Sequence, residues 1–376
     1  MRSPFALVHK DLRVTLRSPL FAILSVLVPV AFTMLYAIVI HVSTTSSIAV
    51  AVADDSPEAR RFVEVMQNLH NDDGRYYEIR TTDPVEASRM YAQGEVGALL
   101  TIPDGFGSAV RAGDHVSLVL DVVNINADGV KNQQLRLEYA VREFAHRSPS
   151  EPASLVVVED KVLDRDIPVT VYLGTALMVL TALYAGIVNA GTLVAREWEE
   201  RTAKGLLLSP AGGSALIFGK WLSTAAVSIV TVAAGILGIA SILDYPVSQI
   251  GPHAMAVLAV VWAYGAALGT LLGVALRRSL PLIPVAVIIA VGHFLVCGYE
   301  SYIRGFAHGG AVEILWRATA WIPLSALVDS FRFEVSSLAQ PPGVGSAFVW
   351  SALLAVCLTA LALLRLNRAI KFTQGQ

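Results

Sequence analysis

The stretch that decides the fold is residues 195–220, AREWEERTAKGLLLSPAGGSALIFGK, which lies between two long apolar runs. It is charged, then apolar, then interrupted by Pro210, Gly212 and Gly213, whereas a simple connecting loop would need only a few polar residues. A charge at the centre of a membrane-spanning helix costs roughly 2.5–3.5 kcal/mol, so the charged part marks a membrane surface. Proline and glycine break helices. We therefore expect a helix, a turn and a second helix lying at the interface.

The composition of the whole chain agrees with a membrane location. Apolar residues make up 55% of the 376 residues and charged residues 15%, whereas an ordinary soluble domain has roughly 25% charged residues. A net charge of -2 argues against a strongly basic nucleic-acid binder. The two cysteines, Cys297 and Cys357, fall inside apolar runs and form neither a disulfide framework nor a metal pair.

Six apolar segments have the length and composition of spanning helices. They are residues 20–43, 168–194, 221–243, 254–276, 282–298 and 345–364. A cleaved signal peptide is the alternative for the first, but its apolar run exceeds the roughly 7–15 residues of a signal core. Residues 1–19 are predicted as a basic amphipathic helix on the membrane surface, and residues 299–342 as interfacial or re-entrant helices on the outer side.

Residues 44–167 change to the pattern of a soluble α/β domain. Helices are expected from Pro57, after the N-cap Ser56, and from Pro84, after Asp83, with a third over 131–147. Strands are expected at 48–52, 76–80, 96–102, 116–123 and 155–162, and their alternation with helices predicts a small mixed sheet. Asp54-Asp55 and Asp72-Asp73 are interpreted as turn and cap residues rather than a metal site.

The charges of the short loops predict how the chain is oriented in the membrane. Basic residues cluster before the first apolar segment, between the second and third, between the fourth and fifth, and after the sixth, which predicts that both termini are cytoplasmic. The α/β domain is then extracytoplasmic. The predicted fold class is an α-helical polytopic membrane protein with six transmembrane helices and an inserted extracytoplasmic α/β domain.

Two further groups of residues have a predicted role, one in helix packing and the other in a substrate pathway. Gly265, Gly269 and Gly273 recur at every fourth position and allow close helix packing, either inside one bundle or across a dimer interface. Polar residues inside apolar segments are candidates for a substrate pathway: Tyr184, Asn189 and His293. For the lone His293, a core histidine with its hydrogen bonds satisfied is the alternative. No metal-ligand cluster stands out.

The motifs of residues 195–220 resemble the cytoplasmic segment between the second and third spans of ABC-2-type (type V) exporter permeases. The resemblance rests on the charge order, Thr202, the leucine run into Ser209-Pro210, and Gly219-Lys220. This chain has Arg201 where the family usually has glycine. Lys10-Asp11 with Arg17-Ser18-Pro19, and the stretch from Trp321 to Arg332, also resemble family segments.

The resemblance implies a permease that docks on a separate ABC ATPase. Two permeases, as two copies or as paralogues, would pair with two ATPases, and ATP and Mg would bind in the partner. The chain has no P-loop, because residues 214–221 fail the G-x-x-x-x-G-K-[ST] pattern. The residues implied in ATPase coupling are Lys10, Asp11, Arg17, Arg196, Glu197, Glu199, Thr202, Leu208, Ser209, Pro210 and Lys220. We expect Glu197 and Glu199 to face the partner, outside the folded cores.

The outer domain resembles that of family members linked to drug or small-molecule efflux, which implies hydrophobic or amphipathic cargo in the multidrug branch. An exporter of a lipid or glycolipid is the alternative within the family. An integral-membrane enzyme or a ligand sensor with an outer α/β domain is the alternative from other classes. An ATPase gene beside this one would separate an exporter from both of these.

Overall fold

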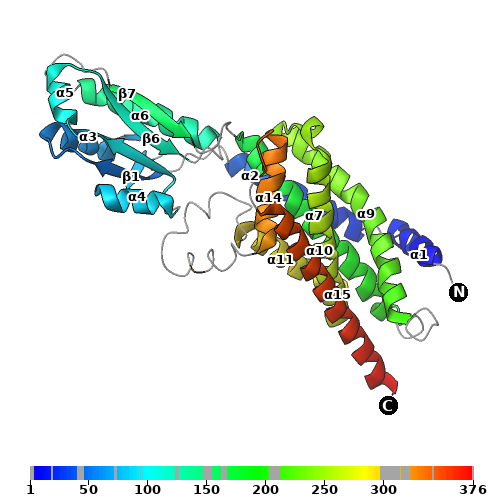
Figure 1. Cartoon of the computed structure of the whole chain (residues 1–376). Coiled ribbons are helices and arrows are strands. Elements are labelled where there is room, and N and C mark those ends of the chain that lie inside the picture. The colour runs from blue at the N-terminus through cyan, green and yellow to red at the C-terminus, as the bar shows by residue number, and fades with distance from the viewer. Residues whose placement is uncertain are drawn as a thin grey trace. The chain divides into compact units, whose positions relative to one another are not determined.

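The computed structural model describes residues 4–17, 20–39, 46–71, 74–93, 95–122, 127–146, 155–161, 167–202, 212–296, 314, 322–340 and 343–374 (Figure 1). Contacts between Cα atoms divide the chain into two compact units. One unit comprises Val39–Tyr172 and Ser301–Ile314. The other comprises Met1–Ile38, Leu173–Glu300 and Leu315–Gln376.

The first unit contains a mixed β-sheet, as the strand and helix alternation predicts. Among the described residues five strands pair in the order β4-β1-β5-β6-β7: β1 Ser46–Val52, β4 Tyr77–Ile79, β5 Ala98–Ile102, β6 Val116–Val122 and β7 Leu155–Lys161. Only the β5–β6 pair among these is antiparallel. The helices are α3 Pro57–Asn68, α4 Pro84–Ala92, α5 Phe106–Ala112 and α6 Ala127–His146. Helix α5 and the short ladder of β2 His70–Asn71 with β3 Gly74–Arg75 were not predicted.

The expected helix starts of this unit are confirmed by their hydrogen bonds. Ser56 Oγ accepts from the Ala59 N–H at 3.2 Å, and an Asp83 carboxylate oxygen accepts from the Glu86 N–H at 2.8 Å. Each bond satisfies a backbone donor that the first helical turn leaves without a partner. Asp54 acts in a turn, as expected, and also accepts from the Gly107 N–H at 2.6 Å, which ties α5 to the end of β1.

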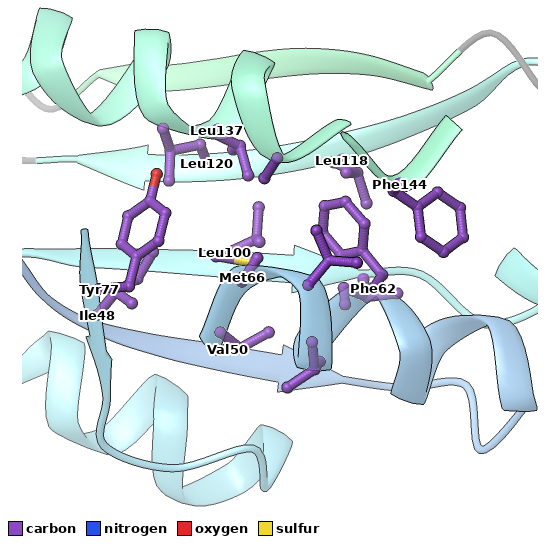
Figure 2. Packing of buried hydrophobic residues seen from close by; sticks show 14 of the residues in the cluster. Ile48, Val50, Phe62, Met66, Tyr77, Leu100, Leu118, Leu120, Leu137 and Phe144 are labelled. Carbon is purple, nitrogen blue, oxygen red and sulfur yellow. The ribbon is translucent and has the colours of Figure 1, made fainter. Parts of the chain in front are cut away.

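The main core of this unit lies between one face of the sheet and α3, α5 and α6 (Figure 2). Phe62 and Phe144 meet edge to face, with ring centroids 5.4 Å apart, and both rings also contact Phe106. Leu100, Leu118 and Leu120 project from the strands toward them. Strand β6 alternates between buried and more exposed side chains, whereas β1 and β5 are apolar on both faces because their other face packs against Ala87 of α4.

The second unit is a bundle of apolar helices. It contains α1 Pro4–Arg17, α2 Leu20–Val39, α7 Val169–Glu199, α9 Gly212–Leu243, α10 Pro252–Leu276, α11 Leu282–Val296, α14 Pro323–Val335 and α15 Val344–Gln374, with a 3-10 turn η1 at Val247–Gln249. Helices α10 and α15 pack side by side, and α14 contacts both. The expected apolar segments all correspond to helices.

The expectation of six spans is only partly met. Four of the described helices are long and apolar enough to cross a membrane by themselves: Thr170–Glu199, Ile217–Leu243, Pro252–Leu276 and Val344–Leu366. A fifth span is possible if α1 and α2, bent by 73° to one another, count as one. Helix α11 has only 15 residues, fewer than the roughly 20 that cross a bilayer.

The expected pair of separate interfacial helices is not present in the described part of residues 195–220. Residues 195–199 continue α7, and residues 212–220 are the first turns of α9. The intervening residues 203–211, including Leu208, Ser209 and Pro210, lie outside the described residues. The helices continue because the charged side chains at their ends have partners within the bundle, as shown below.

Helix α7 is the centre of the bundle. Its apolar stretch is entirely buried, whereas only 28% of the corresponding stretch of α9 and 22% of that of α15 is buried. Gly265, Gly269 and Gly273 of α10 face it closely. A Cβ atom added at these three positions would meet, in turn, the backbone oxygens of Leu183, Ile187 and Gly191. The glycine ridge therefore packs within this chain, which was the first of the two expected arrangements.

Helix α14 is joined to the start of α10 by a carboxylate. The Glu334 oxygens accept from the backbone N–H groups of His253 and Ala254, and the His253 imidazole hydrogen-bonds Ser330. A negative charge at a helix N-terminus is favourable because the macrodipole is positive there. The side chain of Arg332, expected on the outer side, is fully buried and paired with Asp329 at 2.8 Å.

Candidate functional site

The end of α7 contacts several other helices of the bundle through successive residues. The Arg196 guanidinium lies 4.9 Å from the ring centroid of Phe21 in α2. Glu197 bonds to α1 and α9, and the Trp198 ring lies beneath the guanidinium of Arg277, which follows α10, at 4.5 Å. Successive helical residues point about 100° apart, so neighbouring residues reach different sides of the bundle.

Four charged side chains from three helices meet at this level. We call Lys10, Asp11, Glu197 and Lys220 the four-charge cluster. Lys220 Nζ lies 2.7 Å from Asp11 Oδ1 and also donates to Glu197 Oε1, and Lys10 Nζ donates to the two Glu197 oxygens at 2.9 and 3.1 Å. The cluster therefore joins α1, α7 and α9.

Hydroxyl groups also donate to the two carboxylates of the four-charge cluster. Ser223 Oγ donates to Asp11 Oδ2 at 3.0 Å, and the Thr202 hydroxyl donates to Glu197 Oε2. Two cations and two anions make the cluster neutral. A buried charge is tolerated only when it is paired and hydrogen-bonded, because desolvation otherwise costs several kcal/mol.

The four-charge cluster corrects the expectation that Glu197 faces a partner from outside the cores. Glu197 is 5% exposed, Asp11 and Lys220 are each 2% exposed, and only Lys10 of the four remains partly open. This burial could not be predicted from the sequence. Lys10 and Asp11 lie about 200 positions before Glu197 and Lys220, and residues so far apart share no local pattern. Lys220, expected among the coupling residues, is buried among the carboxylates that neutralise it.

Glu199 also bonds within the chain, although its residue is exposed. Its carboxylate accepts from the Ser279 backbone N–H at 2.9 Å and from the Ser279 hydroxyl at 2.7 Å. Ser279 lies in the turn between α10 and α11. Glu199 therefore fixes that turn to the end of α7, and it does not point freely toward a partner.

The remaining coupling candidates lie apart from the four-charge cluster or outside the described residues. Arg17 ends α1 with an exposed side chain. Leu208, Ser209 and Pro210 belong to the undescribed part of the segment. Five of the eleven candidates, Lys10, Asp11, Glu197, Thr202 and Lys220, therefore come together in contact.

The three candidates for a substrate pathway do not form one site. His293 hydrogen-bonds the Tyr264 hydroxyl at 3.0 Å and the Ile289 carbonyl at 2.8 Å, which confirms the alternative of a core histidine with its hydrogen bonds satisfied. Asn189 donates to Ser228 at 3.0 Å across α7 and α9 and lines a small pocket. The Tyr184 hydroxyl is buried and has no hydrogen-bond partner within the described part of the chain.

Sequence reasoning missed Ser223, Ser279 and Arg277 as partners of the charged segment. Ser223 lies one helical turn after Lys220, so it faces the same side of α9, and this spacing was the available signal. Ser279 and Arg277 gave no comparable signal, because a turn residue is placed against another helix only by the tertiary fold. In the described residues no group of histidine, cysteine, aspartate or glutamate has the arrangement of a metal site.

The long apolar helices and the ionic junction at the end of α7 define a polytopic membrane protein. The family model described as ABC-2 family transporter protein matches residues 19–364. The chain belongs to this family, and it is a transmembrane permease of an ABC transporter. Searches of curated proteins and of solved structures found no significant match.

Proposed function

We propose that this chain is the permease subunit of an ATP-driven exporter that moves hydrophobic or amphipathic small molecules out of the cytoplasm or the adjoining leaflet. A separate ABC ATPase subunit binds ATP and Mg and supplies the energy, and two permeases assemble with two ATPases in the cell membrane. The family as a whole works with ABC ATPase subunits, which supports this division of labour.

The four-charge cluster is the observation that carries the proposal. It connects the N-terminal helix to both ends of residues 195–220, which are the segments that the family resemblance assigns to ATPase coupling. A push on α1 or on residues 203–211 would reach α7 and α9 together through these ionic contacts. Helix α7 in turn packs backbone to backbone against α10 along the glycine ridge. Motion at the charged end would therefore pass into the bundle.

The orientation of the chain in the membrane is part of the same proposal. With both termini cytoplasmic, the four-charge cluster lies at the cytoplasmic surface and the α/β unit outside the membrane. Ser117→Cys and Ser88→Cys, two exposed positions, should react with an impermeant maleimide in intact cells, in a background where Cys297 and Cys357 are replaced by serine. Ser209→Cys should react only after permeabilisation. Equal labelling of all three without permeabilisation would contradict the proposed topology.

The function itself is tested by co-expression with an ABC ATPase, which is to be sought among the genes that neighbour this one. We expect the two subunits to purify together in equal numbers and the ATPase rate in nanodiscs to rise with hydrophobic or amphipathic compounds. Purified alone, the chain should bind no ATP. Failure of the subunits to associate, or specific nucleotide binding by the isolated chain, would contradict the proposal. Stimulation by a lipid or glycolipid alone would select the alternative cargo.

A further inference from the structure

Helix α10 begins after a residue that has no side chain to cap it. Its N-cap is Gly251, which makes no side-chain hydrogen bond to the helix, although the first turn of a helix leaves backbone N–H groups without partners. Two of these groups, at His253 and Ala254, donate instead to the Glu334 carboxylate of α14, at 3.3 and 2.5 Å. A cap usually comes from the residue directly before the helix. Here it comes from another helix, 80 positions further along the chain.

The lack of a side chain at residue 251 gives the Glu334 carboxylate its place. A Cβ atom added to Gly251 would lie 2.4 Å from Glu334 Oε1 and 3.0 Å from the carboxylate carbon. The backbone itself does not require glycine here, because a φ of -90° is open to any residue. A local cap at residue 251 and the cap from α14 therefore exclude one another, and this chain has the cap that joins two helices.

Helix α14 holds the first turn of α10 by a second contact. Ser330 precedes Glu334 by about one helical turn, and its hydroxyl hydrogen-bonds the His253 imidazole. The His253 ring also meets Phe348 of α15 edge to face, with ring centroids 5.3 Å apart. The fully buried apolar side chains of α14 include Leu324, Leu327 and Phe331. Apolar packing thus holds α14 in the bundle, and removal of the carboxylate leaves that packing in place.

Helix α10 connects this contact to the level of the four-charge cluster. It has 25 residues, so its ends lie about 37 Å apart at 1.5 Å per residue. Directly after its last residue, the Arg277 guanidinium lies 4.5 Å from the ring centroid of Trp198, the neighbour of Glu197. Between the two ends, the glycine ridge lies against the α7 backbone. Backbone against backbone leaves no flexible side chain to absorb a shift, so we expect α7 and α10 to move together.

We propose that Glu334 is a positioning residue for export, because it makes α14 move with α10. Force that enters at the four-charge cluster passes along α7 and α10 and reaches α14 through this carboxylate. Helix α14 belongs to residues 299–342, the segment expected on the outer side. The inference deepens the proposed function and rests on it, since it takes the four-charge cluster as the place where the ATPase acts.

The cap of α10 can be restored without the connection to α14, and this separates the two roles of Glu334. Glu334→Ala removes both the cap and the connection. Glu334→Ala/Gly251→Ser gives α10 a serine N-cap, for which the missing carboxylate leaves space, but the connection stays broken. Each chain is purified with the ATPase. The melting temperature is measured, together with the change in hydrogen exchange of the α7 and α14 peptides on addition of ATP, Mg and vanadate.

We expect the wild-type chain to show a nucleotide-dependent change in both peptides. Glu334→Ala should lower the melting temperature, and the double variant should recover it. In the double variant the α7 peptide should keep its change, whereas that of α14 should shrink roughly fivefold or more, the lower end of usual coupling effects. A full α14 response in the double variant would overturn the proposal, because the carboxylate would then be a cap only. No α14 response in the wild-type chain would overturn it as well.

A covalent bridge tests the connection without relying on the serine cap. Gly251→Cys/Glu334→Cys is made with Cys297 and Cys357 replaced by serine, and the pair is bridged with ethanediyl bis-methanethiosulfonate. Bridging should restore the α14 response and dithiothreitol should remove it, while an unchanged response after bridging would overturn the proposal. Asp244→Asn is the control. It removes an exposed carboxylate from the loop before α10 at a φ of 51°, which asparagine tolerates, and it should behave as wild type.

Co-purification of the wild-type chain with the ATPase, and stimulation of that ATPase by hydrophobic compounds, are measured separately. Failure of the subunits to associate would overturn both proposals. Normal association and stimulation, combined with a full α14 response in the double variant, would overturn only the role of Glu334 and leave the exporter proposal standing.

Discussion

Lys220 Nζ lies 2.7 Å from Asp11 Oδ1, and both side chains are almost fully buried, although 209 positions separate them in the chain. This pair joins the N-terminal helix to the start of α9. Glu197, which bonds the same ammonium group, adds α7 to the junction. The segments that a coupling role requires are thus connected by charge rather than by apolar packing alone.

Lys220→Met should strongly destabilise the chain. Without this ammonium group, the buried Asp11 loses its ion pair, and the buried Glu197 keeps, among the described residues, its pair with the partly exposed Lys10. Loss of one partner of a buried ion pair costs about 3–5 kcal/mol. The melting temperature of the purified chain in detergent should fall accordingly, while Arg278→Met, which removes an exposed cation, should leave it unchanged. The double variant Asp11→Asn/Lys220→Met restores neutrality and should recover part of the loss.

Charge reversal should separate the buried glutamate from its exposed neighbour. Glu197→Lys would place a third cation beside Lys10 and Lys220, so we expect little chain in the membrane fraction. Glu200→Lys changes an exposed residue and should alter stability by within roughly 0.5 kcal/mol. If this surface docks on the ATPase, the Glu200 variant should reach normal membrane levels yet pull down less ATPase. Normal levels of the Glu197 variant in a blot of membranes would contradict its burial.

Gly269→Ala should destabilise the bundle because the new Cβ would collide with the Ile187 backbone oxygen. Backbone on both sides leaves no flexible side chain to move, and overpacking of this kind costs typically about 1–3 kcal/mol. Gly292→Ala in α11 is the matched control, since its Cβ would meet nothing within 4 Å. Thermal unfolding of the two variants should therefore differ in midpoint. Equal midpoints would show that the helices do not approach this closely.

The α/β unit should lose stability in acid through Asp54. The hydrogen bond from the Gly107 N–H, with bonds from Ser56, holds the pKa of Asp54 below its ordinary value of 3.8. A carboxyl with a lowered folded pKa contributes stability above its unfolded pKa, and this stability is lost as pH falls from about 3.8 through the folded value. Asp54→Asn should remove that part of the pH dependence.

Hydrogen exchange of the peptide containing Gly107, corrected for intrinsic rates, measures this effect. Asp55→Asn is the control, because that side chain is 95% exposed in its pair with Arg60. Its variant should keep the acid dependence of the wild-type protein. A wild-type slope retained in Asp54→Asn would show that another group is responsible.

Much of the fold was determined locally by the sequence. The apolar segments specified the helices of the bundle, and Ser56 and Asp83 specified helix starts, because a cap depends only on residues within one turn. The fourth-residue repeat of Gly265, Gly269 and Gly273 likewise identified a packing surface. The motifs of residues 195–220 identified the ABC-2 family.

Tertiary structure alone decided what those residues contact. The sequence could not show that Glu197 is buried, because its partners Lys10 and Lys220 lie 187 residues before it and 23 residues after it, on two other helices. It could not choose between packing of the glycine ridge inside the chain and across a dimer, because both use the same surface. Where a charge is placed in a membrane protein depends on whether the fold brings an opposite charge to it, and only the packed helices of this bundle establish that.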